Sequence, residues 1–202
     1  MKENLSFALV VSLILLSGCI GQPEGGEKML EVKGKKALLI VAPSNFRDEE
    51  LFKTKAELEK AGATTTIASR EKGTITGMLG GKAEATLSLG EANVAEFDAV
   101  VFIGGSGAAT YFNDSTAQQI AREAAEKEKV LAAICIAPSI LANAGLLQGK
   151  NATSFSSEAD NLQNKGANYT GEAVTVDGKI VTGNGPEAAQ QFGQKIVEAL
   201  AG

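Results

Sequence analysis

Apolar runs that are almost free of polar residues recur along the chain, and they constrain its fold more than any other feature. Residues 36–42 read KALLIVA, residues 99–103 read AVVFI and residues 130–134 read VLAAI. A run without polar alternation predicts a strand buried on both faces, as strands inside a parallel sheet are. Residues 64–68, rich in β-branched side chains, predict a further strand.

Stretches with helical spacing separate these strands. Helices are expected at residues 49–61, 117–127, 137–144 and 187–201, with an edge hairpin in 73–89 and a second hairpin around Asp177-Gly178. Alternating strands and helices imply an α/β domain with a doubly wound, mostly parallel sheet. Ligands bind beyond the carboxyl ends of the strands in such sheets. Functional residues are therefore expected where the strands end.

The beginning of the chain has the pattern of an export signal. An apolar stretch, FALVVSLILL, leads directly into Leu16-Ser17-Gly18-Cys19. This stretch is shorter than the ~20 residues of a spanning helix and resembles a lipoprotein signal, in which the cysteine carries the lipid. We expect a signal peptide at 1–18, a flexible tether at 19–35 and the α/β domain at 36–202. The protein would then be extracytoplasmic and anchored to the membrane by a lipid on Cys19.

Triplets that accept N-linked sugars fit an exported protein, although such triplets also arise by chance. Their asparagines are Asn113, Asn151 and Asn168.

Composition excludes several classes of function. Aromatic residues make up only 5% of the chain, and the net charge is -5, so a nucleic-acid partner is not expected. The chain contains no histidine. A histidine-ligated metal and a catalytic histidine base are therefore ruled out, and we expect neither a metal nor a cofactor.

Candidate functional residues follow three of the predicted strands. Cys135 lies between a strand and a helix that begins near Pro138, a position that suits a nucleophile because a helix N-terminus stabilises a thiolate. A buried structural cysteine is the alternative. The acidic turn 46–51 follows the first strand, although acids are common in a first helical turn. The glycines of 103–107 can present backbone N–H groups to an anion.

These features, in this order, resemble the PfpI superfamily. The matching stretches are FRDEEL (46–51), FIGG (102–105), AICIAPSILA (133–142), ATSF (152–155), GANY (166–169) and VDGKIVTGNGP (176–186). The ordered set spans nearly the whole domain.

The resemblance implies a flavodoxin-like sandwich of helices around the sheet, and a homo-oligomer. It implies that Cys135 is the nucleophile, that Glu50 contacts its sulfur, and that Gly105 and Ile136 supply backbone N–H groups to an oxyanion. A protonated carboxyl can donate a hydrogen bond to a thiolate. The hypothesis is therefore a raised pKa for Glu50 and a lowered pKa for Cys135.

The chain departs from the family pattern at two positions. Ile136 stands where PfpI-type proteases carry histidine, and Phe155 stands near the histidine of the deglycase-like relatives. Peptidase activity is not expected, because proteolysis needs proton transfer to the leaving amine.

Three functions stay open. The first is an enzyme, with glyoxalase-like, deglycase-like or hydrolase-type chemistry on a small molecule such as methylglyoxal. The second is a redox-responsive protein that meets oxidants through Cys135. The third is a binding module without turnover.

Overall fold

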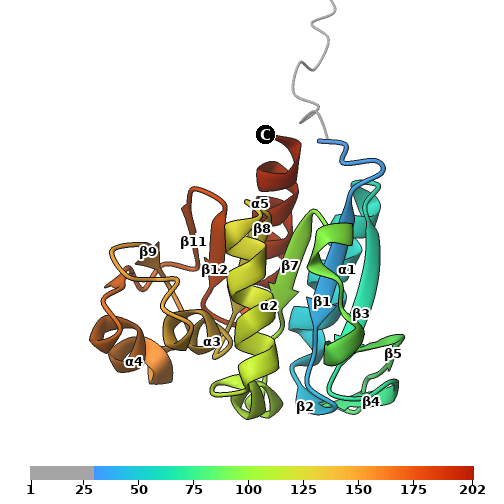
Figure 1. Ribbon diagram of the computed structural model, residues 1–202, viewed down its shortest axis with the longest axis horizontal. Coiled ribbons are helices and arrows are strands. Elements are labelled where there is room, and N and C mark those ends of the chain that lie inside the picture. Colours follow the sequence, from blue (N-terminus) through green and yellow to red (C-terminus); the bar gives the residue numbers. More distant parts are fainter. Residues whose placement is uncertain (1–29) are drawn as a thin grey trace, which may run out of the picture.

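The computed structural model describes residues 30–202, and a seven-stranded sheet runs through them (Figure 1). Its strands are β1 (Lys36–Ile40), β3 (Thr64–Ser69), β6 (Leu87–Ser88), β7 (Ala99–Phe102), β8 (Val130–Ile134), β11 (Val174–Asp177) and β12 (Ile180–Gly183). The strand order is β11-β12-β8-β7-β1-β3-β6. Every neighbouring pair is parallel except β11 with β12, which form the hairpin at Asp177-Gly178.

Helices cover both faces of this sheet (Figure 1). They are α1 (Asp48–Lys60), α2 (Ser115–Glu126), α3 (Pro138–Asn143), α4 (Ala159–Asn164) and α5 (Ala189–Ala201). The core beneath α1 and α5 is separate from the core beneath α2, α3 and α4. The predicted flavodoxin-like, doubly wound fold is therefore confirmed.

The central strands have no polar face because both of their faces are covered. In β1, Leu39 packs into the core under α1 and α5, while Leu38 and Ile40 pack into the core on the other side. These side chains are at most 1% exposed. This two-sided burial explains the unbroken apolar runs in the sequence.

Shorter elements extend the carboxyl edge of the sheet. A three-stranded sheet contains β2 (Ser44–Phe46), β4 (Gly73–Gly77) and β5 (Lys82–Ala85), and a two-stranded sheet contains β9 (Asn151–Ala152) and β10 (Asn168–Tyr169). The 3-10 turns are η1 (Leu89–Glu91), η2 (Val94–Glu96), η3 (Ser106–Tyr111), η4 (Ser156–Glu158) and η5 (Pro186–Ala188). The hairpin expected within 73–89 is β4-β5, whose partner is β2 rather than the large sheet.

Val32, which falls within the predicted tether, packs against the domain, and the predicted domain boundaries stay a prediction. Val32 is 3% exposed, and its N–H donates to the carbonyl of Ala61 at 2.8 Å. The signal segment 1–18, Cys19 and the tether up to residue 29 lie outside the described residues. Between residues 30 and 202, no helix is both long and apolar enough to cross a membrane.

Candidate active site

Cys135 occupies a strained turn between β8 and α3. Its φ is 65°, a left-handed conformation that is uncommon for a residue with a Cβ. Two hydrogen bonds hold this conformation: the Cys135 N–H donates to the Gly183 carbonyl at 2.9 Å, and the Phe155 N–H donates to the Cys135 carbonyl at 2.7 Å. The side chain is 8% exposed. The turn thus places the sulfur at the carboxyl edge of the sheet, nearly covered.

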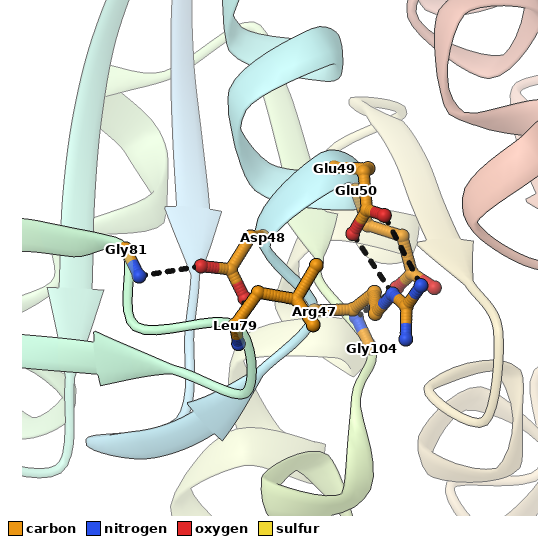
Figure 2. A network of polar contacts seen from close by, with 7 residues as sticks. All are labelled: Arg47, Asp48, Glu49, Glu50, Leu79, Gly81 and Gly104. Carbon is orange, nitrogen blue, oxygen red and sulfur yellow. Dashed lines mark hydrogen bonds and ion pairs between the residues drawn. The ribbon is translucent and has the colours of Figure 1, made fainter.

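Glu50 comes from the first turn of α1 and is fully buried. Its Oε2 accepts a hydrogen bond from the Gly104 N–H at 3.1 Å, while its Oε1 is buried without a partner among the described residues (Figure 2). A Cβ at Gly104 would lie 2.5 Å from both Glu50 Oε2 and the Cys135 Cβ. The structure therefore brings Glu50 and Cys135 together over a position that only glycine can occupy.

Burial raises the pKa of Glu50 to about 7, although hydrogen bonding with Cys135 and Gly104 opposes the shift. This agrees with the raised pKa expected from the sequence. Near neutral pH the carboxyl is consequently present in both protonation states, and it can take up or release a proton.

The expected lowering of the thiol pKa is wrong for this geometry. Burial, and then repulsion by the Glu50 carboxylate, raise the pKa of Cys135 to about 12. Taking a thiolate out of water costs more than the backbone N–H groups of Gly105 and Ile136 return. Protonation of Glu50 removes the repulsion, so the two side chains titrate as a pair and share their proton.

Backbone N–H groups of Gly105 and Ile136 both hydrogen-bond the sulfur and act to lower its pKa. Gly105 has a φ of 91°, and a Cβ there would overlap the backbone nitrogen of Arg47. These are the two residues proposed from the resemblance as oxyanion donors. Their N–H groups converge on one point, the arrangement that stabilises negative charge developing on a substrate oxygen.

The neighbouring charges of the acidic turn have distinct roles that the sequence did not distinguish. The Arg47 guanidinium holds both carboxylate oxygens of Glu49, at 2.8 and 3.1 Å (Figure 2). Asp48, 7% exposed, accepts the N–H groups of Leu79 and Gly81 at 2.8 and 2.7 Å and so holds the β4-β5 turn. The ion pair between Arg47 and Glu49 could have been predicted from the sequence, because an arginine directly precedes three acidic residues. Nothing local pointed to the second contact.

A groove of about 400 Å³ lies beside the cysteine turn. Segments 154–156 and 184–187 line it together with Tyr169 and Gly171. The first segment contains Phe155, whose N–H binds the Cys135 carbonyl, and the second follows Gly183, whose carbonyl accepts the Cys135 N–H. Phe155 forms part of its wall and is 45% exposed. The sequence placed Phe155 near the site but gave no sign of a groove.

The remaining predicted sites take no part in this cluster or lie outside the described residues. Asn113, Asn151 and Asn168 are all exposed, so their glycosylation stays a prediction. Cys19 is not described. In the part of the chain from residue 30 onward, no cluster of three acidic, cysteine or histidine side chains could hold a metal ion.

Comparison with known proteins identifies relatives of this fold and sequence. The DJ-1/PfpI family model matches residues 35–199. An uncharacterized protein of Methanocaldococcus jannaschii is 35% identical over 98% of this chain and 97% of its own length. Deglycase PfpI of Pyrococcus furiosus is 34% identical over 81% of this chain and 98% of its own. The crystal structure of a ThiJ/PfpI domain protein from Brachyspira murdochii is 37% identical, with a TM-score of 0.81 over 83% of this chain and 97% of that one.

Proposed function

We propose, because this chain belongs to the DJ-1/PfpI family, that it is a cysteine-dependent enzyme acting on a small carbonyl compound. The observation that carries the proposal is the convergence of Cys135 and Glu50 over Gly104. A strained nucleophile, a proton carrier with a pKa of about 7 and two backbone donors meet at one point. The deglycase name of the Pyrococcus furiosus relative supports carbonyl chemistry of this kind.

The first step is addition of the thiol across the carbonyl group. A bond forms between the Cys135 sulfur and the carbonyl carbon, and the carbonyl oxygen takes a proton to give a hemithioacetal. Glu50 moves the proton between sulfur and oxygen, since it is the buried acid beside the thiol. The N–H groups of Gly105 and Ile136 stabilise the oxygen while it carries negative charge.

With methylglyoxal as the substrate, the hemithioacetal can proceed to a hydroxy acid. Glu50 takes the proton from the carbon bonded to sulfur and returns it to the neighbouring carbon, while the hydroxyl proton of the hemithioacetal moves to the ketone oxygen. The ketone thereby becomes an alcohol, and the carbon bonded to sulfur becomes the carbonyl carbon of a thioester. Water then releases the acid and restores the thiol. Methylglyoxal and one water thus yield lactic acid without an external oxidant.

A turnover assay tests this proposal directly. Methylglyoxal consumption and lactate formation are measured with the parent chain, with Cys135→Ser and with Glu50→Gln. We expect turnover by the parent and its loss in both variants, since each removes a group that touches the substrate. Glu126→Gln, an exposed carboxyl on α2, is the matched control and keeps full activity. Equal turnover by Cys135→Ser would refute the proposal.

Peptidase activity is not part of the proposal. Serine and cysteine peptidases deliver a proton to the leaving amine, commonly from histidine, and this chain has none. We expect no clearing of casein in a zymogram at protein amounts that consume methylglyoxal.

A redox role is the second candidate, and the unpartnered Oε1 of Glu50 favours it. A protonated Glu50 can donate a hydrogen bond to a cysteine sulfinate, and the Gly105 and Ile136 N–H groups can bind its oxygens. Mass spectrometry after mild peroxide treatment would find a discrete sulfinate on Cys135 without carbonyl turnover. If neither turnover nor sulfinate is found, the third function, a binding module, is favoured.

We further propose that the chain is exported and carries a lipid on Cys19. The similarity to the Methanocaldococcus jannaschii protein covers 98% of the chain and so includes the segment before residue 30, which supports a shared N-terminal feature. Membrane fractionation tests the anchor, since Cys19→Ser would move the protein into the soluble fraction. An unchanged distribution would refute it.

A homo-oligomer is also proposed. Exposed apolar side chains of Phe52, Met78 and Leu79 could be covered by a second copy of the chain. Light scattering coupled to size exclusion gives the molar mass, and a monomer at assay concentration would refute this expectation.

A further inference from the structure

The groove beside the cysteine turn has a one-sided charge. Glu187 is exposed in its lining, and none of the described residues that line it is lysine or arginine. Glu172 directly follows the lining residue Gly171. Among the described residues that line the groove, the charged side chain is therefore a carboxylate, and Glu172 is a second carboxylate next to this lining in the chain.

Glu158 is a further carboxylate, two residues after the lining residue Ser156 in the chain. Its carboxylate accepts hydrogen bonds from the hydroxyl groups of Ser139 at 2.7 Å and Ser157 at 2.9 Å. Hydroxyl donors fix the carboxylate in place but leave its charge uncompensated.

Arg47, the cation of the acidic turn, does not offset this charge. Arg47 gives two hydrogen bonds to Glu49, at 2.8 and 3.1 Å, so its guanidinium is already paired with a carboxylate. An incoming anion would have to compete with that bidentate pair.

One part of the groove wall is apolar and aromatic. Phe155 is 45% exposed, although its backbone N–H binds the Cys135 carbonyl. Tyr169 is fixed beside it by a hydrogen bond from its hydroxyl to the Ser154 carbonyl at 3.2 Å. Pro186 completes the apolar surface. Aromatic faces bind apolar groups and cations, and they repel carboxylates.

We propose that this groove is the subsite for the substituent of the carbonyl substrate, and that it selects apolar or cationic substituents over anionic ones. The inference rests on the proposed function for the identity of the reacting group. Phe155 supplies the contact surface and Glu187 supplies the charge selection. Substrates in which a carboxylate adjoins the carbonyl are disfavoured.

Alkylation of Cys135 tests the charge selection without requiring turnover. Iodoacetamide and iodoacetate are nearly equal in size and differ in charge, so the ratio of their rates cancels the thiol pKa. Mass spectrometry of the Cys135 peptide from the full chain gives both rates, and N-acetylcysteine gives the reference ratio. We expect the ratio of the neutral to the anionic reagent to exceed the reference by about threefold or more at low salt. The excess should shrink as salt is added.

Two variants test whether Glu187 is the residue that causes the charge selection. Glu187→Gln should lower the ratio toward the reference, while Glu126→Gln, an exposed carboxyl on α2, should leave it unchanged. A ratio equal to that of N-acetylcysteine in the parent, or equal effects of the two variants, would overturn the inference. Failure of both reagents to modify Cys135 in the folded chain would overturn the subsite and the proposed function together.

Steady-state kinetics test the apolar wall. Phe155→Ser should raise the KM for phenylglyoxal severalfold and leave kcat unchanged, while Val176→Ser, at the same 45% exposure on β11, should change neither. An unchanged KM in Phe155→Ser would refute the role of Phe155.

Charge-selective alkylation without carbonyl turnover would refute the proposed function and keep the subsite. Turnover of glyoxylate as fast as phenylglyoxal would keep the function and refute the subsite.

Discussion

The raised pKa of Glu50 predicts that protein stability falls as pH rises. Burial raises this pKa from 4.5 to about 7, so the folded chain binds the proton more tightly than the unfolded chain does. The stabilising contribution is complete below pH 4.5 and is lost as pH rises through 7. Because the pKa rises from 4.5 to about 7, and each pH unit corresponds to ~1.4 kcal/mol, the loss is roughly 3 to 3.5 kcal/mol.

Urea denaturation at intervals between pH 4 and pH 8 measures this effect. The quantity to follow is the free energy of unfolding of Glu50→Gln minus that of the parent, because contributions from other titrating groups cancel in the difference. Gln cannot ionise, so the difference should rise by ~3 kcal/mol in favour of the variant between pH 4 and pH 8. The exposed Glu126→Gln should give a flat difference. A flat difference for Glu50→Gln would refute the reasoning, since Glu50 would then ionise as readily in the folded chain as in water.

Two further substitutions test the backbone that supports the site. Gly105→Ala should lower the free energy of unfolding by at least ~1–3 kcal/mol, because φ is 91° and the added methyl overlaps the Arg47 nitrogen. Gly149→Ala is the control, since Gly149 also has a positive φ but has open space around it, and this variant should cost less. Equal melting temperatures for the two variants would contradict the prediction. Asp48→Ala should leave two N–H groups of the 78–81 turn without acceptors, costing roughly 1–3 kcal/mol and speeding their hydrogen exchange; unchanged exchange in that turn would contradict it.

The sheet could be predicted from the sequence because two-sided burial leaves a local signature. The runs at 36–42, 99–103 and 130–134 became β1, β7 and β8 with small changes at their ends. The position of Cys135 followed for the same reason, since the strand, the cysteine and Pro138 are consecutive. Glu50 was distinguished from its acidic neighbours only by resemblance to a known family.

Other parts of the site depend on contacts that no local pattern encodes. Strands β9 and β10 have two residues each, too few to show a period, and helix α4 was not foreseen. Asp48 acts through a turn 31 residues away. The thiol pKa was predicted in the wrong direction because the helix N-terminus can be read from sequence, whereas the extent of burial cannot.

The two ends of the packed domain lie on the side away from the candidate site. The described chain enters at Val32, beside the start of β1, and α5 ends at Ala201 near the same edge, whereas Cys135 and Glu50 lie where the strands end (Figure 1). A domain tied down through either terminus would thus present its reactive face outward. Immobilisation on a resin or a vesicle through these ends should leave the cysteine open to the surrounding medium.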